Sequence, residues 1–274
     1  MVSVVPDLSF DAKGVAAEFV KARRTAGSFA HYPGAPPPDL DAAYRCQDEA
    51  IALWDDAIAG WKVGWIPEPL SERYGAQRLV GPIFRRSVQR LNGSDSVKAP
   101  VFARGFAAIE AEFVFQLAKD APANVTDWTA ETARRFVKTM YVGIEVASSP
   151  LQNINDHGPA VVASDFGNNA GLLLGAEVAD WQSRSLESLN CETRIDGVVV
   201  GRGSAAAVSG GPLAALAFAF RCNARRGRPL RAGEFVSTGA ATGVHSIAAG
   251  QSAEAIFTGI GSLRCMTTPM TPVA

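Results

Sequence analysis

Two glutamates stand one residue apart in an otherwise apolar run. The run is AAIEAEFVFQL, residues 107–117, and the acidic pair is Glu110 and Glu112. In a β-strand successive side chains point to opposite faces, so the pair shares one face while five apolar residues share the other. In a helix the two carboxylates would be about 200° apart and could not act together. The strand interpretation places them roughly 6.6 Å apart at the backbone, close enough to bind one cation.

A third glutamate, Glu145, alternates with apolar residues in MYVGIEVASSP and is expected on the polar face of another strand. Three glutamates without a neighbouring histidine or cysteine would form an all-oxygen site, which favours Mg²⁺ or Mn²⁺ over zinc. The alternative is that all three lie on a solvated sheet face, the commoner position for a glutamate in a strand. The spacing leaves both interpretations open.

Lys62 lies between two tryptophans in AGWKVGW and is a candidate for a cation that faces a ligand. A lysine in such a setting more often extends its amine to water. Thr238 and Gly239, in STGAATG, are expected at the end of a strand, where they would form either a ligand contact or a turn.

A glycine-rich stretch, GRGSAAAVSGG at residues 201–211, precedes a helix that begins near Pro212. It could present backbone N–H groups, Arg202 and Ser204 to an anion at the helix N-terminus. It has neither the lysine of a phosphate-binding loop nor the dinucleotide pattern, so a tight turn is an equal alternative.

General acid–base candidates are isolated from one another in the sequence. Asp165 follows an apolar run in VVASDFGNNAG, and the three histidines, His31, His157 and His245, stand far apart. Any histidine can act as a general base, although one in a loop is usually structural or solvated. The sequence contains no nucleophile elbow.

The elements that must position these residues form an α+β chain. Helical spacing predicts helices at residues 15–23 and 39–60, the second ending at Gly60, and further helices within 126–140 and 212–227. Strands are expected at 107–117, 139–147, 233–240 and 252–267, with a hairpin at the pair Asp196-Gly197. We therefore expect an N-terminal helical segment, residues 1–60, and a mainly β, glycine-rich body, residues 61–274.

The composition favours a small-molecule ligand. The 274 residues include 26 basic and 27 acidic side chains, a formal net charge of −1, so no concentrated positive field points to nucleic acid or an anionic membrane. The most apolar helical run, PLAALAFAF, is too short to span a bilayer. Four scattered cysteines and an N-terminus without a basic flank and apolar core indicate reduced thiols and a cytoplasmic location.

Taken together and in order, the motifs resemble the fumarylacetoacetate hydrolase superfamily, and within it the 2-keto-4-pentenoate hydratase branch. The resemblance extends from about residue 12 to 270 and rests on PPPDLDAAYRCQ, GWKVGW, IEAEFVFQL, GIEVASS, SDFGNNAGLLLG, GRGS before GGPLAAL, LRAGEFVSTGAATG and TGIGSL. It implies N-terminal helices followed by a layered, strongly bent mixed β-sheet, and an assembly of two or more copies.

The resemblance also implies a divalent ion, Mg²⁺ or Mn²⁺, held by Glu110, Glu112 and Glu145. Lys62 matches a lysine that faces the substrate, and Asp165 matches an aspartate near the pocket. Thr238 and Gly239 match a segment that touches the substrate's oxygens. Such an ion would stabilise the enolate of a 2-oxo acid, and a hydratase would then add water at C4 to give a 4-hydroxy-2-oxo acid.

Two positions depart from the family pattern. Leu79, in QRLVG, stands where the hydratases carry an aspartate, and Phe166 follows Asp165 where an asparagine is common, which suggests a more apolar pocket. Hydration remains the first expectation. The alternatives are a decarboxylase or an acylpyruvate-type C–C hydrolase on the same scaffold, a non-catalytic ligand-binding relative, or an ordinary globular domain with solvated glutamates.

Overall fold

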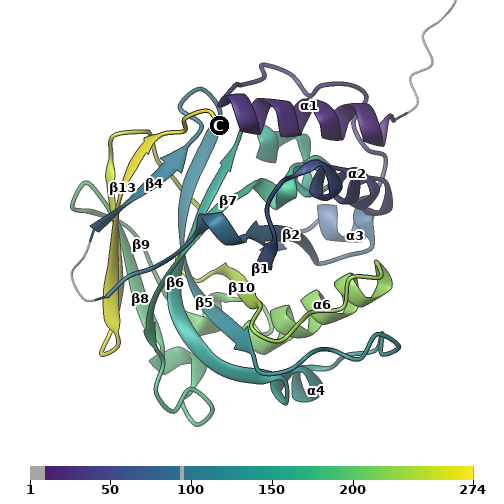
Figure 1. Ribbon diagram of the computed structural model, residues 1–274. Helices are drawn as coiled ribbons and strands as arrows, with labels where there is room; N and C mark the ends of the chain where they lie inside the picture. The colour runs from purple at the N-terminus through teal and green to yellow at the C-terminus, as the bar shows by residue number, and fades with distance from the viewer. Residues whose placement is uncertain (1–9, 93–95, 274) are drawn as a thin grey trace, which may run out of the picture.

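Two β-sheets and a group of helices make up the computed structural model, which describes residues 10–92 and 96–273 (Figure 1). Residues 1–9, where the sequence predicts no secretory leader, lie outside the described residues. The helices are α1 (Ala12–Thr25), α2 (Leu40–Leu53), α3 (Leu70–Tyr74), α4 (Ala130–Arg134), α5 (Pro159–Ser164) and α6 (Pro212–Arg225). Short 3₁₀ turns are η1 (Arg85–Ser87), η2 (Ile154–His157), η3 (Phe166–Asn168), η4 (Leu186–Ser188) and η5 (Ala205–Ala207).

The larger sheet is mixed and has the strand order β2-β1-β10-β5-β6-β7-β3, with the short β11 paired to β5. β1 runs parallel to β10 and β3 parallel to β7, whereas the other neighbours are antiparallel. Its strands are β1 (Ile58–Trp65), β2 (Arg78–Phe84), β3 (Val88–Arg90), β5 (Phe106–Leu117), β6 (Val137–Ser149), β7 (Asn169–Glu177), β10 (Phe235–Ala240) and β11 (His245–Ser246).

The smaller sheet has the order β4-β13-β12-β8-β9. Its strands are β4 (Ser96–Val101), β8 (Asn190–Ile195), β9 (Val198–Ser204), β12 (Ser252–Phe257) and β13 (Gly261–Pro269). β8 and β9 form the hairpin that the sequence predicts, and the turn residues Asp196 and Gly197 both have positive φ, 48° and 79°. This is the backbone that an Asp-Gly pair adopts readily in a two-residue hairpin turn.

The curled large sheet lies between the helices and the smaller sheet (Figure 1). β4, β12 and β13 pack against β6 on one side, and α6 packs against β1, β2 and β10 on the other. The apolar face of β5 turns to the smaller sheet, where the rings of Phe113 and Phe257 meet edge-on with their centroids 5.4 Å apart. The α+β fold with a strongly bent mixed sheet is therefore confirmed. The two N-terminal helices share their core with the body.

Helix ends follow the local signals in most places. The Asp11 side chain accepts a hydrogen bond from the N–H of Gly14 at the start of α1, and Asp39 does the same for Ala42 in α2. α6 begins with Pro212 in its first turn. Among the described residues no helix combines the length and apolar character needed to cross a bilayer.

Two predicted helix boundaries were wrong. The helix expected to end at Gly60 ends at Leu53, and Gly60 belongs to β1. A Cβ on Gly60 would lie 2.3 Å from the carbonyl oxygen of Phe235 on β10, so this glycine permits close strand pairing instead of ending a helix. The helix expected within 126–140 is reduced to α4, because the pairing of β6 with β5 begins at Val137 and overrides local propensity.

Candidate active site

Strand register brings the three glutamates together. Glu110 on β5 is the direct cross-strand partner of Glu145 on β6, and Glu112 follows two residues later on the same face of β5. One carboxylate oxygen from each residue lies within 4.8 Å of the other two. Glu112 and Glu145 are completely buried and Glu110 is 6% exposed, so the cluster does not lie on a solvated sheet face.

β10 supplies hydrogen bonds to one oxygen of Glu112. The Ser237 hydroxyl donates to Oε2 at 2.5 Å, and the backbone N–H of Gly239 donates to the same oxygen at 2.9 Å. Thr238, between them, turns its hydroxyl away and donates to the carbonyl oxygen of Phe113. The other oxygen of Glu112, Oε1, is buried and has no hydrogen-bond partner within residues 10–92 and 96–273.

Glu145 is held from two directions. Its Oε1 accepts a hydrogen bond from the Asn169 amide at 3.0 Å and lies 3.3 Å from the Lys62 ammonium. Lys62 Nζ also donates to Oδ1 of Asn168 at 3.3 Å. Oε2 of Glu145 is a second buried carboxylate oxygen that has no hydrogen-bond partner in the part of the chain that the structure describes. The two unpartnered oxygens, Glu112 Oε1 and Glu145 Oε2, belong to the same cluster.

The pKa values of the cluster show that it lacks positive charge. Burial, together with the charge of Glu145, raises the pKa of Glu110 to about 7, and burial with the charges of Glu145 and Glu110 raises the pKa of Glu112 well above its usual value. Burial alone would lower the pKa of Lys62, but the three carboxylates raise it. With all three carboxylates ionised and one ammonium beside them the formal charge would be −2, and the raised pKa values of Glu110 and Glu112 mean that the metal-free cluster relieves part of this charge by taking up protons. All-oxygen donors, two open lone-pair positions and this charge fit a divalent cation.

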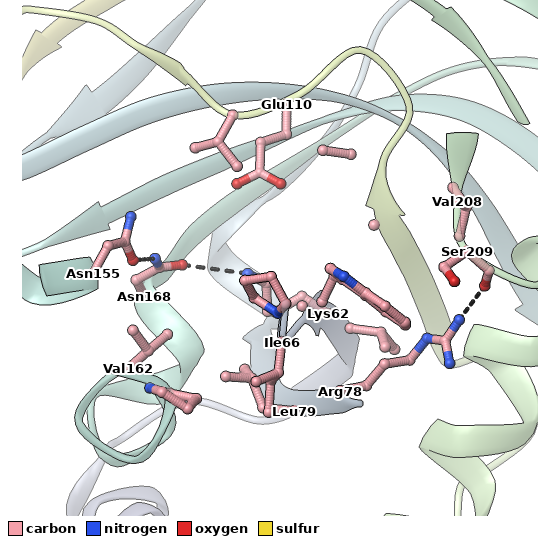
Figure 2. A pocket seen from close by; sticks show the side chains of 18 of the residues that line it. Lys62, Ile66, Arg78, Leu79, Glu110, Asn155, Val162, Asn168, Val208 and Ser209 are labelled. Carbon is pink, nitrogen blue, oxygen red and sulfur yellow. Dashed lines mark hydrogen bonds between the residues drawn. The ribbon is translucent and has the colours of Figure 1, made fainter. Parts of the chain in front are cut away.

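A cavity of about 470 Å³ opens in front of the cluster (Figure 2). Lys62 and Glu110 reach it from the sheet, and the backbone around Thr238 and Gly239 forms another part of its wall. Leu79, which stands where the hydratases carry an aspartate, also lines it. The remaining wall comes from residues after β1, from η2 to η3, and from the loop after η5, including Trp65, Ile66, Pro67, Leu70, Arg78, Asn155, Pro159, Val162, Asn168, Val208 and Ser209.

Asp165 lies outside this cavity. It is buried, its Oδ1 lies 2.6 Å from Nε of Arg23 on α1, and its Oδ2 accepts a hydrogen bond from Ser149 at 2.6 Å. Directly after it, the backbone of η3 has positive φ at Phe166 and Asn168, 52° and 57°. The Arg23–Asp165 pair therefore anchors the turn that carries the asparagines bonded to Lys62 and Glu145.

The apolar side chain of Phe166 also faces elsewhere. It lines a second cavity, of about 250 Å³, and packs against Phe84 and Trp54 with ring centroids 4.9 and 5.9 Å apart. The inference that Phe166 makes the substrate pocket more apolar was therefore wrong.

Several other candidates do not meet the cavity in the described structure. Arg202 lies on β9, the edge strand of the smaller sheet, where its exposed guanidinium pairs with Glu192 at 2.7 Å. The Ser204 hydroxyl accepts a hydrogen bond from the N–H of Ala206 within its own turn. None of the three histidines of the chain is among the residues that line the cavity.

The residues that hold Lys62 and the glutamates in place were not predicted from the sequence. Asn168 and Asn169 stand in the SDFGNNAG motif, but no spacing rule indicates that their amides reach Lys62 and Glu145. Ser237 directly precedes the Thr238-Gly239 pair, and strand register pairs it with Val114. No local pattern indicates that its hydroxyl reaches Glu112, two residues along β5. Arg78 stands beside Leu79 in QRLVG, but only Leu79 in this stretch was interpreted as a departure from the family pattern.

Comparisons with known proteins agree with this geometry. The family model described as fumarylacetoacetate (FAA) hydrolase C-terminal matches residues 74–267. A 2-keto-4-pentenoate hydratase of Paraburkholderia phymatum is 26% identical over 235 residues, 84% of this chain and 86% of that protein. A 4-oxalocrotonate decarboxylase of a Pseudomonas species is 30% identical over 162 residues, 58% of this chain and 60% of that protein.

Among solved structures, the 4-oxalocrotonate decarboxylase from Pseudomonas putida G7, complexed with magnesium and adipate, superposes with a TM-score of 0.77 at 21% identity. The match covers 93% of this chain and 97% of that one, and at this identity it supports the fold. The family match spans well over half of the sequence and includes the strands that carry Glu110, Glu112 and Glu145. The chain belongs to the fumarylacetoacetate hydrolase family.

Proposed function

We propose that this protein is a divalent-metal-dependent hydratase that adds water to a small 2-hydroxydienoic or 2-oxoenoic acid and releases a 4-hydroxy-2-oxo acid. The observation that carries the proposal is the buried cluster of three carboxylates, Glu110, Glu112 and Glu145, beside the single ammonium of Lys62 at the wall of a ligand-sized cavity. The hydratase relative, which aligns along most of its length, supports hydration as the reaction.

The three glutamates would hold the ion, Mg²⁺ or Mn²⁺. When bound, a divalent cation supplies positive charge for the carboxylate and ketone oxygens of a 2-oxo acid, which makes the adjacent C3 position more acidic. The hydrogen bonds from Ser237 and Gly239 fix one oxygen of Glu112, and the Asn169 amide fixes one oxygen of Glu145. These contacts leave the other two oxygens oriented by the protein, so the donor set is organised before a ligand arrives.

Lys62 is the group that we assign to proton transfer. The ionisable side chains that line the cavity are those of Lys62, Arg78 and Glu110; an arginine holds its proton too firmly to transfer it, and Glu110 belongs to the cation site. Asn168 and Glu145 hold the Lys62 ammonium in place, and the raised pKa keeps it protonated in the free protein. It can therefore donate to a developing carbanion or alkoxide and stabilise negative charge on the substrate.

The apolar part of the wall limits the access of solvent water. Leu79, Ile66, Val162 and Val208 surround the polar groups, so water reaches the reacting carbon only through the open side of the cavity. Figure 2 shows Leu79 and Ile66 beneath Lys62, across from Glu110. Asp165 has a positioning role in this proposal, because it touches Arg23 and Ser149 and not the cavity.

The test is turnover of 2-hydroxypenta-2,4-dienoate with Mg²⁺, followed by loss of the dienoate absorbance and by identification of the product. Formation of 4-hydroxy-2-oxopentanoate, abolished by chelation and by Glu110→Gln, is expected. Arg73→Gln, on the exposed surface of α3, serves as the control variant. Turnover that survives both chelation and Glu110→Gln would refute the metal-dependent mechanism.

A second candidate is decarboxylation or acylpyruvate-type C–C hydrolysis at the same site. It is favoured by Leu79 at the cavity wall and by the 4-oxalocrotonate decarboxylase relative. Product analysis separates the reactions, since decarboxylation releases CO2 and C–C hydrolysis yields two carboxylic acids. A protein that binds the ion and oxalate but converts none of these substrates would be a non-catalytic ligand-binding relative.

A homo-oligomer and a cytoplasmic location complete the proposal. All four cysteines are free thiols, and three of them are buried, as suits a reducing compartment. Light scattering during size-exclusion chromatography tests the assembly, and a molar mass equal to the 28.8 kDa chain would contradict it.

A further inference from the structure

Arg78 is a buried cation at the wall of the same cavity. It is the first residue of β2 and only 7% of its surface is exposed. Its Nη2 donates a hydrogen bond to the carbonyl oxygen of Ser209, and its guanidinium carbon lies 5.0 Å from the centre of the Trp65 ring. In Figure 2 the guanidinium lies at the side of the pocket away from Asn155 and Asn168, below Ser209.

The described structure gives Arg78 no carboxylate partner, which sets it apart from the other buried cations. Arg23 pairs with Asp165 at 2.6 Å, Lys62 with Glu145 at 3.3 Å, and Arg226 with Asp48 at 2.7 Å. Arg78 forms no such pair among the ion pairs of residues 10–92 and 96–273. Buried charges are normally paired, because the loss of hydration is costly.

The surroundings of Arg78 add to its positive field. Burial and the charge of Arg221, on α6, both lower the pKa of Arg78. An arginine nonetheless stays protonated, so the repulsion persists as unbalanced positive charge at this side of the cavity. Of its donors, the described hydrogen bonds use only Nη2, which leaves Nε and Nη1 for a ligand.

We infer that Arg78 binds a second carboxylate of the substrate, so that the protein prefers dicarboxylic 2-oxo acids, with one acid group at each end, over monocarboxylic ones. The inference rests on the proposed function, which places the 2-oxo acid end at Glu110 and Lys62. A guanidinium and a carboxylate form paired, charge-assisted hydrogen bonds, and Trp65 restrains the guanidinium plane through its stacking contact. The cavity volume, about 470 Å³, is within the range of small-ligand sites.

The same contact bears on the choice of reaction. Loss of CO2 from the distal end would break the bond between the carboxylate carbon and the chain, leave the electron pair on the chain carbon, and turn the anion into a neutral molecule. A guanidinium that stabilises the distal carboxylate lowers the free energy of the substrate relative to the transition state for loss of CO2, and so disfavours decarboxylation. Arg78 therefore favours retention of the distal acid group and hydration of the chain.

The experiment compares two ligands that differ only at the far end, 2-oxohexanedioate and 2-oxohexanoate. Calorimetric titration of each into the protein with saturating Mg²⁺ is expected to show that the dicarboxylate binds roughly 10- to 100-fold more tightly. In Arg78→Met the preference should disappear while the affinity for 2-oxohexanoate stays within about twofold, which also shows that the variant is folded. Arg73→Met, an exposed arginine on α3, should retain the wild-type preference.

Equal affinity of the wild type for the two acids would overturn the inference and leave the proposed function standing. A preference that survives in Arg78→Met would overturn it as well, because another group would then hold the distal carboxylate. If neither acid binds, the 2-oxo acid site itself is wrong and the inference falls with it.

Discussion

Replacing Arg23 by methionine is expected to destabilise the protein strongly, because it leaves the Asp165 carboxylate buried without its cation. The guanidinium lies 2.6 Å from Oδ1 of Asp165 and also donates to the carbonyl oxygens of Asn169, Ser148 and Asp165 at 3.0, 3.3 and 3.3 Å. Both side chains are almost completely excluded from water. Breaking a buried pair from one side costs about 3–5 kcal/mol of the free energy of unfolding.

For a chain of this size, that loss corresponds to a fall in melting temperature of roughly 10 °C. Urea unfolding followed by far-ultraviolet circular dichroism gives the free energy, and thermal melts give the midpoint. Arg24→Met, one residue later on α1 and exposed, is the matched control and should cost under about 1 kcal/mol. The variant with both Arg23→Met and Asp165→Asn should lose less stability than the sum of the two single changes, because it removes both charges.

Arg23→Met should also affect ion binding, because the turn after Asp165 carries residues that contact the site. Asn168 and Asn169 orient Lys62 and Glu145, so Arg23→Met should also weaken the affinity for the divalent ion at a temperature where the variant is folded. A cost below about 1 kcal/mol, together with unchanged ion affinity, would refute the reasoning, since the carboxylate would then not depend on its partner.

Three further expectations follow from the same structure. In the metal-free protein the folded-state pKa of Glu110, about 7, exceeds the unfolded value, so the folded state binds more protons and its stability should fall as pH rises from about 4.5 to 7. Thermal melts across this pH range measure how steeply the stability falls with pH, and Glu110→Gln should make this fall smaller. A stability that rises with pH would contradict the prediction. Lys62→Met should lower kcat by roughly 10²–10⁴-fold with the fold retained, measured from initial rates, and a loss under tenfold would remove Lys62 from proton transfer. Gly60→Ala should cost about 1–3 kcal/mol in urea unfolding, because its Cβ would lie 2.3 Å from the Phe235 carbonyl oxygen.

The sequence predicted what depends on alternation along one strand. Glu110 and Glu112 share a face of β5 because side chains alternate, and the local turn chemistry of Asp196-Gly197 marked the hairpin. That Glu145 belongs to the same cluster followed only from the family resemblance. Its position opposite Glu110 is set by the register between β5 and β6, which no local pattern determines.

Contacts between distant segments were beyond sequence reasoning. Arg23 and Asp165 are 142 residues apart, and helical spacing gave Arg23 no role beyond a place on a helix. The same holds for Arg78, whose place in the cavity wall depends on segments that are distant in the sequence. Where long-range pairing competes with local propensity, as at Gly60 and Val137, the pairing decided the structure and the helix predictions failed.

Calorimetric titration of Mg²⁺ and of Mn²⁺ into the metal-free protein tests the central claim most directly. One divalent ion per chain should bind to the wild type, and binding should be lost in Glu112→Gln and in Glu145→Gln. At an ion concentration a hundred times the Kd, the ion should also stabilise the fold by about 2.7 kcal/mol. No heat of binding for either ion in the wild type, or undiminished binding in both variants, would contradict the assignment of these glutamates as the metal site.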